Sequence, residues 1–138
     1  MTQIEKEILL RDLCMRLPYG VVMATGYGKG LLTSIRVNDS NEKLGINIDP
    51  MLTRLFNVNE VKPYLFPLSS MTEEQKADCP IGETNLNIII SNIGCYGIIE
   101  IPWRLSYLFV DWCNKNHFDY RGLIPLNLAN DATGKNIY

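Results

Sequence analysis

The first hydrophobic pattern in the chain has the spacing of a helix. Residues 2–17 carry apolar side chains three to four positions apart, with charged residues between them. Thr2 and Glu5 have the spacing of a capping box, in which both side chains accept backbone amides. Pro18 disfavours helical geometry at the preceding residue and ends the helix. The residues expected to face the core are Ile4, Ile8, Leu9, Leu13 and Leu17. Those expected to face water are Glu5, Lys6, Arg11 and Asp12.

Residues 19–25, 31–37 and 44–49 are rich in β-branched and apolar side chains, which is typical of strands. Short polar or glycine-rich turns, GYGKG and NDSNEK, separate them and predict an antiparallel meander. Leu44, Ile46 and Ile48 alternate with smaller or polar residues, so they are expected to share one face of the sheet. Residues 50–61 are less regular, and we interpret them as a short helix followed by an extended piece.

Prolines shape the middle of the chain. Pro63 and Pro67 predict extended geometry in KPYLFP, and they argue against a central strand because proline cannot donate to a ladder. Tyr64 and Phe66 lie between them, either as an exposed aromatic ridge or, as we favour, in a strap that covers one sheet edge. Residues 69–78 predict a short helix, with Ser70 and Glu73 at capping-box spacing.

The pattern of the last third predicts a second hairpin and a second long helix. Residues 86–91 and 95–101 have strand-like composition around the turn SNIG. Residues 103–116 predict an aromatic-rich helix, which we expect to be buried against the sheet. The sequence therefore predicts a single α+β domain spanning residues 1–138. Its antiparallel sheet of about five strands would be covered by the N-terminal helix and by helix 103–116.

Composition restricts the class of protein. With 138 residues, 46% hydrophobic and 20% charged, the chain matches an ordinary globular domain. A formal net charge of −2 gives no general attraction to phosphate backbones, so nucleic acid is not an expected partner. The charged N-terminal residues do not have the pattern of a signal peptide, and no apolar run is long enough to span a membrane. We therefore predict a cytoplasmic protein with reduced thiols.

The sequence lacks the residues that several kinds of functional site require. The four cysteines are scattered and the chain has a single histidine, so we predict neither a metal site nor a cofactor. GYGKG lies between two predicted strands instead of before a helix, which favours a hairpin turn over a phosphate-binding loop. Cys113, four residues before His117, is either a nucleophile paired with a base or, as we favour, a core residue.

The best candidate for a site is the segment that follows the second long helix. His117, Asp119, Tyr120 and Arg121 bring an imidazole, a carboxylate, a phenol and a guanidinium within five positions. In one interpretation His117 is a base oriented by Asp119 or Asp111. In the other, which we favour, His117 caps helix carbonyls, Asp119 forms an Asx-type turn, Tyr120 packs and Arg121 pairs with a carboxylate.

Three stretches, LCMRLPYGVV, VKPYLFPLSSMTEEQ and DWCNKNHFDYRGLIPLNLA, resemble a family of small uncharacterised proteins from phages, prophages and mobile elements of gut bacteria of the Bacteroides group. They cover about a third of the chain and occur in the order of that family. Residues 85–103 are longer than the usual linker, and Cys79-Pro80 interrupts the acidic helix. The resemblance implies an accessory protein of a phage or integrated element inside a bacterial host. It supplies no activity, cofactor or catalytic residue.

These observations lead to a functional hypothesis and two alternatives. We expect a non-enzymatic protein-interaction or regulatory module that binds a host or phage protein through His117, Asp119, Tyr120 and Arg121, or through the aromatic pair at 64 and 66. No residue is assigned a catalytic role. The first alternative is a small hydrolase or transferase centred on His117, Asp119 and Arg121. The second is weak nucleic-acid binding, and its candidate residues are Arg104, Lys115, Arg121 and Lys135.

Overall fold

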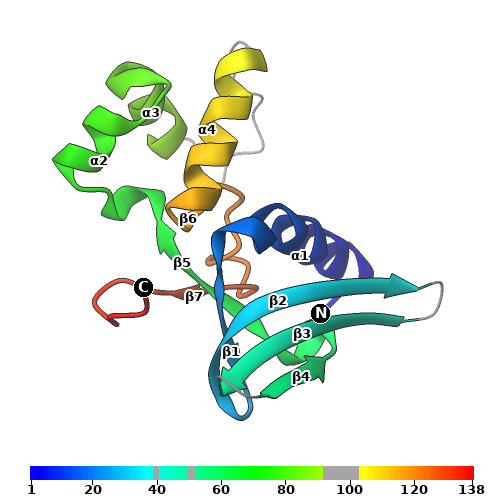
Figure 1. Ribbon diagram of the computed structural model, residues 1–138. Helices are drawn as coiled ribbons and strands as arrows, with labels where there is room; N and C mark the ends of the chain where they lie inside the picture. The colour runs from blue at the N-terminus through cyan, green and yellow to red at the C-terminus, as the bar shows by residue number, and fades with distance from the viewer. Residues whose placement is uncertain (39–40, 50–51, 92–102) are drawn as a thin grey trace.

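Helices and a mixed sheet make up the computed structural model, which describes residues 1–38, 41–49, 52–91 and 103–138 (Figure 1). The α-helices are α1 (Gln3–Arg16), α2 (Glu73–Asp78), α3 (Gly82–Ser91) and α4 (Trp103–Lys115). The strands are β1 (Val22–Thr25), β2 (Gly28–Asn38), β3 (Asn41–Asp49), β4 (Leu52–Phe56), β5 (Lys62–Pro67), β6 (Phe118–Asp119) and β7 (Asn130–Asp131). Short 3-10 turns cover Leu17–Tyr19, Val58–Glu60 and Leu68–Ser70. The predicted α+β class is confirmed.

The sheet differs from the prediction in size and in strand direction. Among the described residues it has seven strands in the order β4-β3-β2-β1-β5-β6, with β7 pairing to β5. Strands β1 to β3 form the predicted antiparallel meander, which β4 extends, whereas β6 and β7 run parallel to β5. The GYGKG segment is a hairpin turn, and Gly28 adopts the positive φ of 120° that such a turn requires. An all-antiparallel sheet of about five strands was wrong because β6 and β7 are too short to leave a pattern in the sequence.

Strand β5 contradicts the expectation that its prolines bar an inner strand. It pairs with β1 at Lys62 and Pro63, with β7 at Tyr64 and Leu65, and with β6 at Phe66 and Pro67. Each ladder is only two residue pairs long, for example Met23 with Pro63 and Ala24 with Lys62. Short ladders need few amide donors, so the missing N–H groups of Pro63 and Pro67 are tolerated. The strap interpretation of this segment is therefore wrong.

Three other segments also differ from their predictions. Residues 52–56 form β4, followed by a 3-10 turn, and not a short helix. Residues 86–91, predicted as a strand, belong to α3, in which Leu86 and Ile89 are buried one turn apart. A short apolar run does not distinguish a strand from a buried helix. Its predicted partner strand at 95–101 lies outside the described residues. Helix α2 is capped by Thr72 with Gln75 instead of by the predicted pair.

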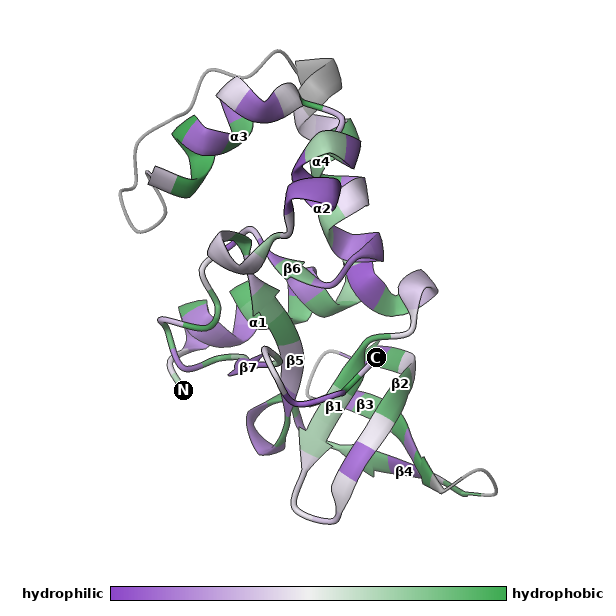
Figure 2. Cartoon of the chain, turned by 90° about the vertical axis from the view of Figure 1, so that its left-hand side faces the viewer, coloured by the Kyte–Doolittle hydropathy of each residue, from purple (hydrophilic) through white to green (hydrophobic). Residues whose placement is uncertain are grey.

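The buried side chains form two clusters. The first lies between α1 and the inner face of β1 to β4 and contains Leu9, Leu13, Leu32 and Ile46. The second joins α3, α4 and the segments that flank α2 to β6, and it includes Cys113. Figures 1 and 2 show these three helices standing apart from the meander. The expectation that the aromatic-rich helix covers the sheet was therefore wrong: α4 packs on the other helices and on β6.

Helix α1 follows its predicted start but not its predicted polar face. The capping box is confirmed, since the Thr2 amide donates to Glu5 at 2.6 Å and the Glu5 amide donates to Thr2 at 3.2 Å. Leu9 and Leu13 are fully buried, as expected, whereas Ile4 is 71% exposed. Asp12, predicted to face water, is fully buried. The buried Asp12 is part of the first candidate site.

Candidate functional site

Asp12 and Arg16 form a fully buried ion pair in the last turns of α1. Arg16 Nε donates to Asp12 Oδ2 at 2.6 Å, and Arg16 Nη2 donates to Oδ1 at 3.2 Å. Nη2 also donates to the carbonyl of Phe118 at 2.9 Å, which links α1 to a residue 102 positions later in the chain. The i,i+4 spacing of the pair is visible in the sequence. Its burial is not, because it depends on chain segments distant in sequence.

Arg121 completes this ion pair from the outside. Its Nε lies 3.3 Å from Asp12 Oδ1, so the prediction that Arg121 pairs with a carboxylate is confirmed. Tyr120 lies beside both guanidinium groups, 5.3 Å from that of Arg16 and 5.1 Å from that of Arg121. Two cations therefore share one buried carboxylate and one half-buried aromatic ring.

Asp119 organises the loop that follows. Its two carboxylate oxygens accept the amides of Leu123 and Ile124, each at 2.8 Å, which is a longer loop than the predicted Asx-type turn. The side chain is almost completely buried. Burial raises the pKa of the Asp119 carboxyl, while the two amides and nearby Arg16 act in the opposite direction. The carboxylate is thus engaged in holding backbone.

His117 ends α4 through its backbone and not through its ring. Its φ is +60°, and its amide donates to the carbonyl of Asn114 at 3.3 Å. The imidazole does not cap the helix as predicted: it stacks on Tyr138 with centroids 3.8 Å apart and planes 6° apart, and its buried Nδ1 has no partner in the described structure. Burial, and secondarily Arg16, lowers the pKa of His117 to about 4. The ring is therefore neutral near pH 7.

Tyr138 brings the two sequence-predicted candidate segments together. Its hydroxyl donates to the carbonyl of Tyr64 at 2.6 Å and accepts the amide of Val22 at 3.3 Å. Its ring lies 5.8 Å from that of Phe66 and also stacks on His117. Burial raises the pKa of Tyr138 to about 12. Tyr64 and Phe66 are half-buried, so the aromatic ridge is not open either.

The proposed catalytic residues have separate partners. His117 stacks on Tyr138, Asp119 holds two amides and Arg121 turns to Asp12. The other candidate carboxylate, Asp111, accepts a hydrogen bond from the Tyr19 hydroxyl. Cys113 is fully buried, and burial raises its pKa, which disfavours the thiolate. Within residues 1–38, 41–49, 52–91 and 103–138, no group of three or more His, Cys, Asp or Glu residues is arranged to hold a metal ion.

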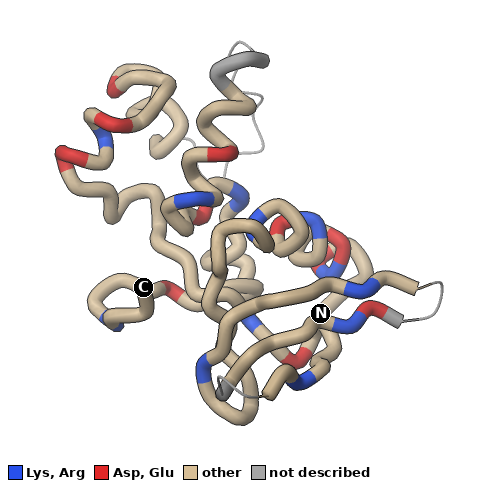
Figure 3. The backbone as a smooth tube through the Cα atoms, in the orientation of Figure 1, with Lys and Arg blue, Asp and Glu red and all other residues tan. Residues whose placement is uncertain are grey.

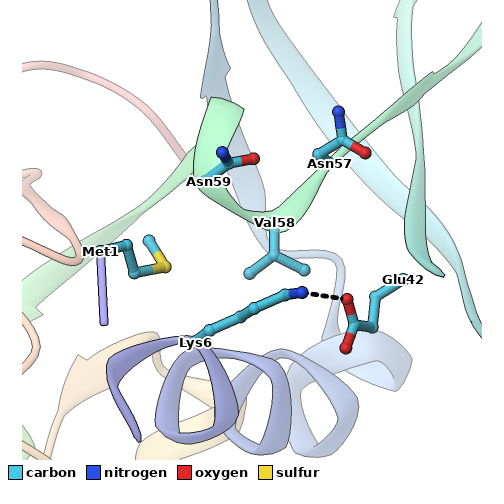
Figure 4. A pocket seen from close by; sticks show the side chains of 6 residues that line it. All are labelled: Met1, Lys6, Glu42, Asn57, Val58 and Asn59. Atoms are coloured by element: carbon cyan, nitrogen blue, oxygen red, sulfur yellow. Dashed lines mark ion pairs between the residues drawn. The ribbon is translucent and has the colours of Figure 1, made fainter. Parts of the chain in front are cut away.

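A small pocket opens at the start of α1. It has a volume of about 260 Å³, and its lining residues are Met1, Lys6, Glu42, Asn57, Val58 and Asn59. Figure 4 shows Lys6 reaching across the floor of the pocket to Glu42, with which it forms an ion pair. None of the sequence-predicted site residues lines it. Because the Lys6 and Glu42 side chains already neutralise each other, neither of them offers a free charge to a ligand.

The most open feature is the edge strand β4. Within the described part of the chain, β3 is the only strand paired with it. Its first four residues are exposed, including Leu52 at 51% and Leu55 at 53%. The guanidinium of Arg54 lies 4.5 Å from the ring centroid of Tyr27 and forms no ion pair with a described carboxylate. Sequence analysis missed this edge because residues 50–61 were interpreted as partly helical.

The sheet face beside β4 is basic. Arg36 on β2 and Lys43 on β3 are directly opposite each other, as the neighbouring blue positions in Figure 3 show. Like charges across a ladder destabilise it, and Lys43 is held away from Arg36 by its hydrogen bond to Asn57 Oδ1 at 2.6 Å and lies near the Glu60 carboxylate. The same face carries Leu31 of β2 and Leu55 of β4, and Gly45 lies on β3 between these two strands.

No family model matches the chain, and no curated protein or solved structure matches it either. Among the described helices, none is both long and apolar enough to cross a membrane.

Proposed function

We propose that the protein is a non-enzymatic interaction module that binds an extended segment of another protein along the free edge of β4. The observation that carries this proposal is the exposure of Leu52, Thr53, Arg54 and Leu55 on a strand that, among the described residues, pairs with β3 alone. An unpaired edge offers backbone donors and acceptors to an added strand, and alternate side chains provide selectivity.

The side chains of β4 define the chemistry of the partner. A residue opposite Arg54 would be acidic, because this guanidinium has no carboxylate partner in the described structure. Neighbouring residues of the added strand would lie beside Thr53 and Leu55, where β-branched apolar side chains fit.

A second copy of the chain is a poorer partner for this edge. Antiparallel pairing of β4 with itself in the centred register would place Arg54 opposite Arg54. Like charges directly opposite each other destabilise a strand pair. An acidic, β-branched segment from a different protein has no such conflict.

The cellular setting is part of the proposal. The resemblance of three stretches to proteins of phages and mobile elements supports an accessory role in the cytoplasm of a bacterial host, with a host or phage protein as the partner. Such a role needs a stable surface that holds a partner, and an edge strand provides it.

Two matched peptides test the proposal by isothermal titration calorimetry: STVEVTS and STVKVTS. The protein is expected to bind the glutamate peptide roughly 5- to 30-fold more tightly, since one pair is attractive and the other repulsive. Arg54→Glu is expected to reverse this preference. Arg11→Glu, the same charge change on the exposed side of α1, is expected to leave it unchanged. Equal affinities for both peptides, in both the wild type and Arg54→Glu, would contradict the proposal.

A further inference from the structure

Strands β1 and β5 separate after two residue pairs, and a side chain fills the gap between them. The ladder pairs Ala24 with Lys62 and Met23 with Pro63, so the next pair in this register would be Val22 with Tyr64. Instead, the Val22 amide donates to the Tyr138 hydroxyl at 3.3 Å, and that hydroxyl donates to the Tyr64 carbonyl at 2.6 Å. One phenol hydroxyl therefore takes the place of a rung of the sheet.

The walls of this gap are suited to an aromatic ring. His117 stacks on the ring at 3.8 Å, and Phe66 lies 5.8 Å away at an angle of 49°. At the hydroxyl end of the ring, one backbone donor and one backbone acceptor match the two hydrogen-bonding functions of a phenol. A phenylalanine ring has no hydroxyl and would lose both hydrogen bonds, which the 44% exposed side chain of Tyr138 forms at the surface of the protein. The gap thus distinguishes tyrosine from phenylalanine.

The segment that carries Tyr138 has few other attachments. Residues 133–136 are exposed, and the hydrogen bonds shown for their amides stay within the turn: Thr133 to the Asp131 side chain and Lys135 to Ala132. Gly134 and Asn136 both have positive φ. The ring is the main anchor of this segment, so its departure would break few backbone hydrogen bonds.

We propose that the gap between β1 and β5 is a binding site for a tyrosine side chain, filled here by Tyr138, and that a tyrosine of a partner protein takes its place. This site is separate from the β4 edge and does not rest on it. The Lys29 ammonium lies 5.7 Å from the Tyr64 ring, so acidic residues next to the incoming tyrosine would gain a charge partner. The partner segment is therefore an acidic one that contains tyrosine.

A second copy of the chain is not the expected occupant. Each copy already holds its own Tyr138 in the gap, at the high effective concentration that a short connection provides. Exchange between two copies would form the same contacts and gain none. A partner with flanking acidic residues adds contacts that Tyr138 lacks.

The site is tested first by emptying it. In Tyr138→Ala, p-cresol is expected to bind at least roughly 10-fold more tightly than toluene, because only p-cresol replaces both hydrogen bonds. Binding is followed by NMR at the Val22 amide and the His117 ring. The control is Tyr107→Ala, which removes an equally large side chain that is 70% exposed, and it is expected to bind p-cresol no better than wild type. Equal binding of toluene, or no p-cresol binding to folded Tyr138→Ala, overturns the proposal.

Displacement is tested on the unaltered protein, which removes any dependence on how the variant folds. The acidic peptide DEYED is expected to shift the NMR signals of Val22, His117 and Tyr138, and DEFED is expected to leave them unchanged. Identical shifts with both peptides, or none with DEYED at millimolar concentration, overturn the proposal. An equal mixture of Tyr138→Ala and His117→Ala is expected to sediment as monomers. A dimer in that mixture would assign the ring to a second copy and overturn the choice of partner.

Discussion

Two parts of the sheet treat their polar groups in opposite ways. Around β5 and α1, polar groups pair within the protein: Asp12 with Arg16 and Arg121, and the Tyr138 hydroxyl with two strands. At β4, the edge groups, two leucines and Arg54 face outward. In this protein the charged and hydrogen-bonding residues near β5 and α1 therefore stabilise the fold, whereas β4 offers the open surface.

We call the part of the protein around β5 and α1 the closed region. Substitutions there should change the free energy of unfolding more than substitutions at β4. Replacing Asp12 leaves the fully buried Arg16 without its carboxylate and also releases Arg121. We expect Asp12→Ala to lower the free energy of unfolding by about 3–5 kcal/mol, the usual cost of breaking a buried ion pair. Urea denaturation measures this change. Glu7→Ala, on the exposed side of the same helix, is expected to cost less than about 0.5 kcal/mol, and similar losses in both variants would show that the closed region is not distinguished by its charges.

A smaller effect concerns pH. The folded-state pKa of His117 is lowered to about 4 from 6.5, so below pH 6.5 the unfolded chain takes up a proton that the folded protein refuses. Stability should then fall as the pH drops from about 6.5 to about 4.5, by about 1–2 kcal/mol after allowance for solvent screening of a partly exposed ring. Most carboxylates titrate below this window.

The matched variant for this prediction is His117→Asn. Asparagine tolerates the positive φ of 60° at this position but does not titrate. Its unfolding free energy, measured by urea denaturation at pH 6.5 and 4.5, should change less with pH than that of the wild type. A wild-type stability that is constant over this range would contradict the neutral, stacked histidine.

The features that could be predicted from the sequence are those set by residues close together along the chain. The capping box of α1, the meander and the GYGKG turn each depend on a few neighbouring positions. The prediction of a strand at residues 86–91 was wrong because a short apolar run fits a strand and a helix equally well. The prediction that prolines bar β5 from the inside of the sheet was wrong, because its ladders are only two pairs long and tolerate them.

The candidate site was predictable to a similar extent. The pairing of Arg121 with a carboxylate was predicted, but the identity of that carboxylate was not, since Asp12 lies on a helix more than a hundred positions away. The burial of Asp12 and the position of Tyr138 depend on contacts between α1, β1, β5 and the end of the chain. No local pattern encodes such contacts, so a sequence periodicity places Asp12 on the wrong side of its helix.

The central claim is that β4 accepts an added strand, and amide hydrogen exchange tests it most directly. With saturating STVEVTS, the β4 amides that are not bonded to β3 should become protected by roughly 10-fold or more, because each would gain a hydrogen bond to the peptide. Amides around Asp119, in the closed region, should exchange at an unchanged rate. Binding of the peptide without added protection in β4, or with protection confined to the closed region, would contradict the account.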